Sequence, residues 1–473
     1  MDSDGAILDQ LRQQNAQFVQ QNAQFVQQNA QLAQTVARLT DQVEQLTREV
    51  GQLRAQLEQA QAAAARQAAP FRRPERLKKP LESHKRPGRP CGHPGAHRRI
   101  PPIDHHQMVP LPCCPHCGGA IRDVHPVEQI IEEIPPVRPV VYKIVTYRAT
   151  CERCGEVCSR HPLQTSDATG AAGTHLGPRA IALATALNKY HGLPMRRTCK
   201  ILRELAGLDL TAGALSQMVD RVADRVADDY EGLINRIRGS PAVNADETSW
   251  WVGGPGWWLW TFTCPDLTVY RVDHTRGAKV VQEILGEDFA GVMVSDCLSS
   301  YDAATYRKHK CIAHHLRAIE AAGHLEGTKD PTYLRQWTLL LKSVIALHRL
   351  WEQKVLTDED IAAKRLALEA WIDQLLAQAP TQGGDARIRN RLAKQRPHLL
   401  GCLTDVRVEP TNNRAERALR PAVIARKLSC GNKTDRGRRS WEILASLGAT
   451  HHQTGRDFVS FLAHRIALAK KGR

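Results

Sequence analysis

The sequence predicts a multidomain α+β protein, and three patterns support this prediction. Apolar residues recur in heptads over the first 69 residues, paired cysteines lie between residues 113 and 160, and β-type alternation begins near residue 242. A chain of 473 residues has room for roughly three domains, at about 150 residues each. Its hydrophobic content of 42% excludes a wholly disordered chain.

Residues 1–69 have the pattern of a coiled coil. Apolar residues occur at every seventh position, at Leu11, Phe18, Phe25, Leu32, Leu39, Leu46 and Leu53. Three residues before each of these lie Leu8, Asn15, Asn22, Asn29, Val36, Val43 and Val50. Val at a with Leu at d favours a parallel dimer, and Asn at a sets register and oligomer number at a cost in stability. We therefore predict self-association as a coiled-coil dimer or higher oligomer. A single helix folded back on the body is the alternative.

Residues 70–112 are predicted to be a basic, proline-rich linker without a packed core. Residues 70–100 carry a net charge of +8, and residues 406–473 carry +10. Two basic blocks favour a polyanionic partner, and we expect DNA. Arg86 and Arg89 lie in an Arg-Pro-Gly-Arg-Pro segment that would fit a narrow A·T minor groove. A flexible tether is the alternative interpretation of this segment.

Two Cys-x-x-Cys pairs predict a zinc ribbon over residues 113–160. The four cysteines are Cys114, Cys117, Cys151 and Cys154, and a glycine follows each pair. Such pairs direct four thiolates at one tetrahedral zinc ion. The runs 127–134 and 139–149 are rich in Val, Ile and Tyr, which predicts two strands joined at Pro135-Pro136. Because four thiolates close the coordination shell, we expect structural Zn2+.

Residues 170–238 are predicted to form a helical, helix-turn-helix-like DNA-binding domain. Apolar patterns predict helices over 176–192, 195–206 and 212–237, and Thr211 is the candidate N-cap of the third helix. Two helices joined by a glycine-containing turn resemble a DNA-reading unit. The side chains expected to contact phosphates are those of Arg196, Arg197 and Lys200. An ordinary helical bundle is an equally good interpretation of this spacing.

From residue 242 the sequence pattern changes from helical to strand-like. Strands are predicted over 242–252, 256–264 and 267–273, followed by a helix over 276–286 and a short buried strand over 291–296. Three strands, a helix and a fourth strand match the start of a ribonuclease-H-like α/β fold. Asp246 lies in the first strand and Asp296 ends the fourth, and these two strand ends are adjacent in that fold.

A second acidic candidate region begins at residue 411. Thr411 is a candidate N-cap, and Glu416 falls on the second turn of the predicted helix, between arginines. Helical patterns fill residues 318–405.

Four segments give the chain a specific resemblance. They are ADETSW around Asp246, VSDCLSSYD around Asp296, CIAHHLR at 311–317 and NNRAERALRP at 412–421. With the coiled coil, basic linker and zinc ribbon in that order, the chain resembles transposases of the insertion-sequence-sixty-six family. The resemblance implies that Asp246, Asp296 and Glu416 are a DDE triad. It also implies that residues 239–317 and 406–473 form one α/β catalytic domain, with residues 318–405 as a helical insertion between its two parts.

The resemblance also implies supporting groups and partners. Cys311 and His314 match the family's C-x2-H element, and Arg317 and Asn413 are expected to support the active site. Thr411 stands where an Asp is often found, and His315 makes HHL from the usual HL. Neither departure touches the triad. Accessory proteins of the same element are implied partners.

The triad suits phosphoryl transfer. Two divalent ions about 3.5–4 Å apart clamp the attacking and leaving oxygens in such reactions. Mg2+, or Mn2+ in its place, prefers carboxylate oxygens, so two such ions are expected per active site. Asp246 would contact both ions, and Glu416 would hold the second. Glu247 and Asp302 are neighbouring carboxylates that could also contribute. The alternative is a catalytically silent DNA-binding protein, or a subunit that depends on an accessory partner.

Cations surround the predicted Glu416 helix, where a scissile phosphate needs them. They are Arg414, Arg417, Arg420, Arg426, Lys427, Lys433, Arg436, Arg438 and Arg439. Five tryptophans crowd residues 250–260, and we expect most of them to fill the core. The polar first residues and the absence of a run of about 18 apolar residues favour a cytoplasmic bacterial protein without a membrane anchor.

Overall fold

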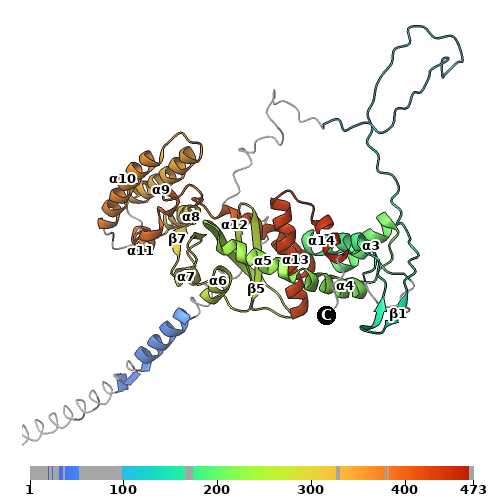
Figure 1. The fold of residues 1–473 in the computed structure, drawn as a ribbon. Coiled ribbons are helices and arrows are strands. Elements are labelled where there is room, and N and C mark those ends of the chain that lie inside the picture. Colours follow the sequence, from blue (N-terminus) through green and yellow to red (C-terminus); the bar gives the residue numbers. More distant parts are fainter. Residues whose placement is uncertain are drawn as a thin grey trace, which may run out of the picture. The chain divides into compact units, whose positions relative to one another are not determined.

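The computed structural model describes most of the chain, which divides into two units, Met1–Ala120 and Ile121–Arg473 (Figure 1). The described residues are 20, 24, 31–32, 34–35, 38–52, 99–165, 174–325, 331–378, 380 and 383–467. Within the first unit, residues 38–52 are helical and exposed, including Leu39 and Leu46 of the heptad series. Coiled-coil pairing remains a prediction. Arg86 and Arg89 lie outside the described residues.

The region of the predicted ribbon contains one short hairpin. Strands β1 (Arg148–Cys151) and β2 (Gly155–Cys158) pair in antiparallel fashion, with Cys151 opposite Gly155. The strands predicted over 127–134 and 139–149 are wrong. Within the described range 99–165, residues 121–147 contain no strand. Their apolar side chains are exposed, so no packing rewards β pairing, and prolines remove backbone donors from this run.

Five helical segments follow. They are α2 (Pro178–Thr185), the π-helical turn η3 (Ala186–Tyr190), α3 (Met195–Ala206), α4 (Ala212–Arg225) and α5 (Ala227–Arg238). The N-cap prediction for Thr211 is confirmed, because its side chain accepts a hydrogen bond from the Ala214 backbone N–H at 3.2 Å. The predicted helix over 212–237 is interrupted at Val226, which separates α4 from α5.

The sheet positions the candidate site. Its strands are β3 (Ala242–Trp250), β4 (Trp257–Cys264), β5 (Leu267–Asp273), β6 (Val292–Ser295) and β7 (Arg307–Lys310). Their order is β5-β4-β3-β6-β7. The first three strands pair antiparallel, whereas β6 and β7 run parallel to β3. This mixed sheet, with α6 (Ala278–Leu285) between β5 and β6, is consistent with the predicted ribonuclease-H-like fold.

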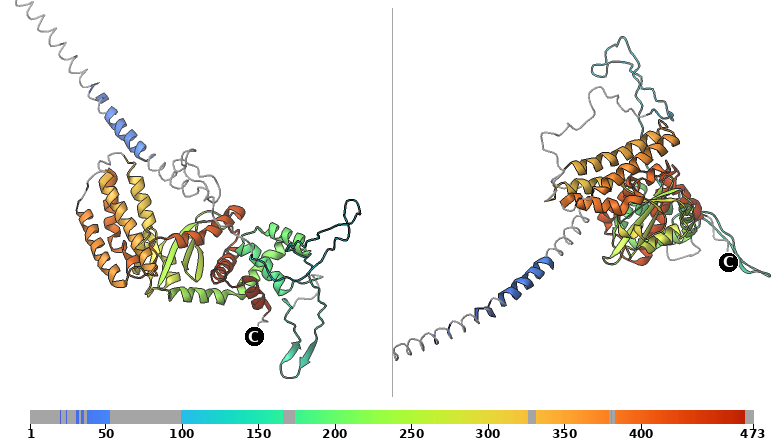
Figure 2. Two further views of the ribbon diagram at one scale, coloured as in Figure 1. Left: turned by 90° about the horizontal axis from the view of Figure 1, so that it is seen from above. Right: turned by 90° about the vertical axis from the view of Figure 1, so that its left-hand side faces the viewer.

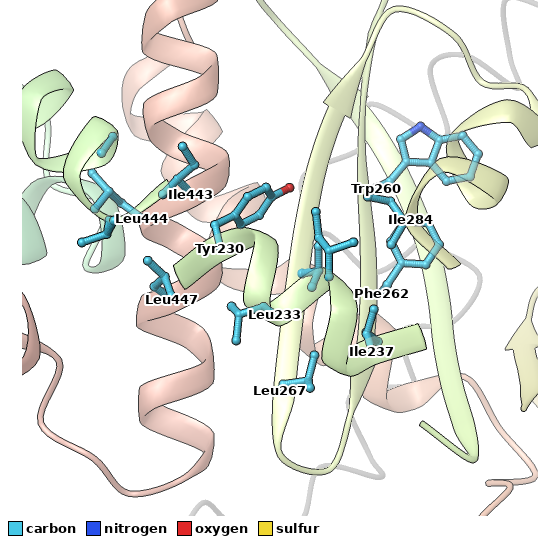
Figure 3. Packing of buried hydrophobic residues seen from close by; sticks show 14 of the residues in the cluster. Tyr230, Leu233, Ile237, Trp260, Phe262, Leu267, Ile284, Ile443, Leu444 and Leu447 are labelled. Carbon is cyan, nitrogen blue, oxygen red and sulfur yellow. The ribbon is translucent and has the colours of Figure 1, made fainter. Parts of the chain in front are cut away.

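Helices pack against the sheet through a continuous apolar cluster. Tyr230, Leu233 and Ile237 of α5 belong to this cluster together with Phe262 of β4 and Leu447 of α13 (Figure 3). The helices α13 (Asp435–Gln453) and α14 (Phe458–Ala467) also contact α4 and α2. The predicted helical region and the sheet therefore share one core.

The helix α13 also satisfies the outer edge of the sheet. Three backbone N–H groups of the edge strand β5 donate to side chains of this helix, four residues apart. Thr268 N–H donates to Thr450 Oγ1 at 3.1 Å, Tyr270 N–H to Ser446 Oγ at 2.9 Å, and Val272 N–H to Glu442 Oε1 at 2.6 Å. Since an open edge strand invites pairing with other chains, this arrangement protects the sheet.

A helical bundle occupies the position of the predicted insertion. It comprises α9 (Pro331–Glu352), α10 (Asp358–Ala377) and α11 (Gly383–Gln395), which lie side by side (Figure 2) and are followed by two short 3₁₀ turns, η4 (Arg396–His398) and η5 (Gly401–Leu403). Trp337 and Leu340 are fully buried in its core. The remaining helices are α7 (Ser299–Asp302), α8 (Ile312–Ala322) and α12 (Asn413–Ser429). Within the described residues, no helix is both long and apolar enough to cross a membrane.

Candidate active site

Two carboxylates meet at the centre of the sheet. Asn244 of β3 is in parallel register with Val294 of β6. Two residues further on, the same register brings Asp246 beside Asp296, just beyond the end of β6. Each carboxylate accepts one backbone N–H, from Glu247 and from Leu298, both at 2.9 Å. Parallel pairing of the two central strands therefore explains why two aspartates 50 positions apart face one site.

The third predicted carboxylate reaches this site on helix α12. Glu416 lies in the first turn, because the helix begins at Asn413 with Asn412 as its N-cap. The prediction of Thr411 as the N-cap is therefore wrong. The Asn412 side chain does not cap the helix either. It is fully buried, and its amide donates to the carbonyl oxygen of Ala245 at 2.8 Å.

The charges of Asp296 and Glu416 both act on the Asp246 carboxyl. Burial raises the pKa of Asp246 well above its usual value, and the charges of Glu247, Asp296 and Glu416 raise it further. Little positive charge compensates these three carboxylates. Arg317 pairs with Glu416 at 3.2 Å, and both side chains are substantially exposed to solvent. This cluster is therefore short of positive charge.

The neighbouring carboxylates of Glu247 and Asp302 are neutralised inside the fold. Glu247 is almost fully buried, and it accepts bonds from Arg276 at 2.6 Å and from the Tyr301 hydroxyl at 2.6 Å. Asp302 pairs with the fully buried Lys310 at 2.9 Å. Both carboxylates therefore have cationic partners, whereas Asp246 and Asp296 form no salt bridge with any described residue.

The C-x2-H element lies between the sheet and α12. Cys311 is fully buried, and its sulfur accepts the backbone N–H of Asn412 at 3.1 Å. Burial lowers the pKa of His314, whose Nε2 lies 3.1 Å from Arg317. His315 is buried and contacts the Cys297 thiol at 3.7 Å. Asn413, in contrast, is exposed.

Sequence reasoning missed several buried polar residues of this site. Asn412 was visible only as half of an Asn pair, and Asn244 as one polar residue in an apolar strand. Lys310 donates to Ser295 Oγ and to the Asp296 carbonyl oxygen, at 3.2 and 3.0 Å, although it ends a short, mostly charged run. The alternation of β3 and the NN pair were the available signals, but neither indicates which partner lies across the fold.

The predicted DNA-contacting cations fall into two groups. Four are engaged within the fold. Arg426 donates to Ser249 Oγ, Arg438 binds Glu442, Arg414 pairs with Glu409, and Arg436 pairs with Asp220. The others are exposed and form no salt bridge with any residue that the structure describes, and they are Arg417, Arg420, Lys427, Lys433 and Arg439.

The predicted DNA contacts on α3 are all on its exposed face. Arg196, Arg197 and Lys200 are solvent-accessible, and Lys200 pairs with Glu204 at 3.5 Å. Because Thr198 and Cys199 of the same helix are buried, α3 presents a basic outer face above a packed inner face.

Each cysteine pair forms a compact turn. The backbone N–H groups of His116 and Cys117 lower the pKa of the Cys114 thiol. Those of Arg153 and Cys154 do the same for Cys151. In the described parts of the chain, however, no three His, Cys, Asp or Glu side chains form a preformed metal cage.

A mixed sheet of this strand order, with Asp246 inside β3, Asp296 just after β6 and Glu416 on a later helix, is consistent with a DDE-type transposase domain. The model of the family described as Transposase IS66 family matches residues 173–440. The chain therefore belongs to the insertion-sequence-sixty-six (IS66) family of transposases.

The chain is also similar to two curated proteins, at 26% and 23% sequence identity. The uncharacterized protein y4qI of Sinorhizobium fredii is 26% identical over 328 residues, which cover 61% of this chain and 58% of the relative. The uncharacterized protein y4jD of the same organism is 23% identical over 383 residues, covering 74% of this chain and 73% of the relative. The chain thus spans less than two thirds of the length of y4qI.

Proposed function

We propose that this protein cleaves DNA at the ends of an insertion sequence and transfers the freed strand to target DNA. The observation that carries the proposal is the position of Asp246 in β3 beside Asp296 just after the parallel strand β6, with Glu416 close enough to affect the pKa of Asp246. Strand cleavage and transfer need no covalent enzyme intermediate, because water and then a 3′-hydroxyl are the successive nucleophiles.

The donor set fits divalent cations. Carboxylate oxygens are the ligands that Mg2+ and Mn2+ prefer, and among the residues that the structure describes the three carboxylates form one salt bridge, between Glu416 and the partly exposed Arg317. We assign Asp246, Asp296 and Glu416 as the ligands. When two such ions are bound, they activate the nucleophile and stabilise the leaving oxygen. Glu416 would then exchange Arg317 for a cation.

The residues of the chain itself hold the DNA. The unpaired cations of α12 and the following loop extend from Glu416, so they are suited to bind phosphates beside the scissile bond. Arg417, Arg420 and Lys427 lie on the exposed face of the same helix. Arg426 and Arg438 anchor the helix and the loop instead, and we assign them a structural role. The exposed face of α3 is a second candidate DNA contact.

The N-terminal parts are proposed to assemble and position the enzyme. The two cysteine turns have the N–H···S geometry that lowers thiol pKa values and favours thiolate ligands, which supports a structural Zn2+ held by all four cysteines. The heptads of residues 1–69 support a dimer or higher oligomer, since two element ends must be processed together. The domain limits predicted from sequence remain part of this proposal.

A cleavage assay tests the proposal. Purified full-length protein is incubated with labelled element-end DNA and Mg2+ or Mn2+, beside Glu416→Gln and the matched surface variant Glu287→Gln. We expect cleavage by the wild type and by Glu287→Gln, and none by Glu416→Gln. DNA binding should be equal in all three. Binding without cleavage by the wild type, also when the element's accessory proteins are added, would favour the silent DNA-binding alternative.

A further inference from the structure

The strongest unused feature is a buried polar link between helix α12 and strand β3. Asn412 is fully buried and makes three hydrogen bonds across the fold. Its Nδ2 donates to the Ala245 carbonyl at 2.8 Å, its Oδ1 accepts from Asn244 Nδ2 at 3.2 Å, and its backbone N–H donates to the Cys311 sulfur at 3.1 Å. All three partners precede Asn412 by about 100 residues or more.

These contacts join the neighbours of the three candidate ligands. Ala245 is the residue before Asp246. Cys311 is tied to β6, because its backbone N–H donates to the Ser295 carbonyl at 2.9 Å, one residue before Asp296. The Asn412 carbonyl, in turn, accepts the backbone N–H of Glu416 at 3.2 Å in the first turn of α12.

We propose that Asn412 is a positioning residue that fixes Glu416 relative to Asp246 and Asp296, with Cys311 completing the link to β6. A backbone bond on one side of Asn412 and side-chain bonds on the other leave the start of α12 little freedom to slide along the sheet. This inference rests on the proposed function, because it assigns a task within the carboxylate site.

The chemistry explains why an asparagine serves here. A carboxamide donates to one backbone carbonyl and accepts from another side chain at the same time, which neither an ionised Asp nor Ala can do. A fully buried, fully bonded polar group specifies one arrangement, because every alternative leaves partners unsatisfied. Misplacing a reacting group by about 1 Å can lower a rate about 100-fold.

The test is the effect of Mn2+ on thermal unfolding of the full chain, measured together with DNA cleavage. We compare wild type with Asn412→Ala, Glu416→Gln and the double variant. Asn432→Ala is the matched control, since Asn432 is also buried and links Trp250 of β3 to the segment after α12, at 2.8 Å from the indole N–H.

We expect Mn2+ to raise the unfolding temperature of the wild type and of Asn432→Ala, although the latter unfolds at a lower temperature without Mn2+. The rise should shrink in Asn412→Ala, and the double variant should show no smaller rise than Glu416→Gln alone. The cleavage rate of Asn412→Ala should fall about 100-fold at saturating DNA, with an unchanged KM for DNA.

Two results would overturn the inference alone. One is a full Mn2+ effect in Asn412→Ala, and the other is an additive loss in the double variant, because additivity marks independent sites. A wild-type protein without any Mn2+ effect would instead refute the proposed carboxylate site, and the inference would fall with it.

Discussion

Replacing Asp246 by asparagine should make the folded protein more stable in buffer without added divalent cations. In the wild type, burial and the charges of Glu247, Asp296 and Glu416 all oppose ionisation of this carboxyl. Its one backbone donor is the Glu247 N–H, which an amide oxygen can still accept. The substituted amide would therefore keep the hydrogen bond and remove the charge, which is why cleavage should be lost while stability rises.

The magnitude follows from the environment of Asp246. Burying an ion costs several kcal/mol, but a raised pKa lets the wild type limit the loss by taking up a proton. We therefore expect Asp246→Asn to gain about 1–3 kcal/mol at pH 7. With a urea m-value of about 3 kcal/mol/M, the midpoint should rise by roughly 0.3–1 M. Tryptophan fluorescence reports on this region, because all nine tryptophans lie between residues 250 and 441.

The stability gained by Asp246→Asn should depend on pH in a direction set by the raised pKa of Asp246. The folded-state pKa of Asp246 is raised, so its penalty is absent below pH of about 4, where both states are protonated, and grows as pH rises toward the folded pKa. The gain of Asp246→Asn should follow the same course. Asp266→Asn should show the opposite sign, because Cys264 and Arg236 lower the pKa of Asp266. A variant no more stable than the wild type at pH 7 would refute the reasoning.

Three further predictions concern the edge of the sheet, a buried histidine and the cations. Ser446→Ala should lower the free energy of unfolding by about 1–3 kcal/mol, because it leaves the Tyr270 N–H without a partner; an unchanged urea midpoint would contradict this. Burial lowers the pKa of His309 to about 4, so its contribution to stability is complete above pH of about 6.5 and falls by roughly 3 kcal/mol as pH drops to 4. His309→Gln should flatten that part of the pH profile, and an unaltered profile would count against it. Arg420→Ala should reduce the salt slope of DNA binding by about 1 without changing stability, whereas Arg438→Ala should mainly destabilise the fold; equal effects of the two variants on the salt slope would show that the division into free and engaged cations is wrong.

Local sequence patterns correctly predicted the helices and strands whose own residues show the periodicity or capping typical of them. The strands β3 to β6, helix α3 and the Thr211 cap follow from alternation, helical periodicity and capping chemistry. The strands predicted over 127–134 and 139–149 failed because their apolar side chains have no surface to cover. Apolar alternation predicts a strand only when another element buries one of its faces.

The strand β7 shows the opposite failure. Its sequence Arg-Lys-His-Lys has no strand signal, yet three of its four residues are buried beside β6. Burial is possible because Lys310 meets Asp302 and the Asp296 carbonyl, and His309 contacts the Pro410 carbonyl at 3.2 Å. Such partners lie up to about 100 residues away, so no local window contains the information.

The same long-range pairing separates the carboxylates of the site by role. The sequence offers five carboxylates for the site, and composition does not show which of them bind a metal ion. They are Asp246, Glu247, Asp296, Asp302 and Glu416. In the fold, Glu247 pairs with the partly buried Arg276 and Asp302 pairs with the buried Lys310, so both carboxylates are already neutralised. Asp246 is surrounded by like charge, and Glu416 has only a solvent-exposed arginine, which contributes little to holding it. Unbalanced negative charge beside the middle of β3 and the end of β6 lowers the stability of the protein when no ligand is bound. A bound divalent cation would compensate this negative charge and so explain why the fold keeps it. The higher stability of Asp246→Asn and its loss of cleavage therefore both measure the uncompensated charge at Asp246.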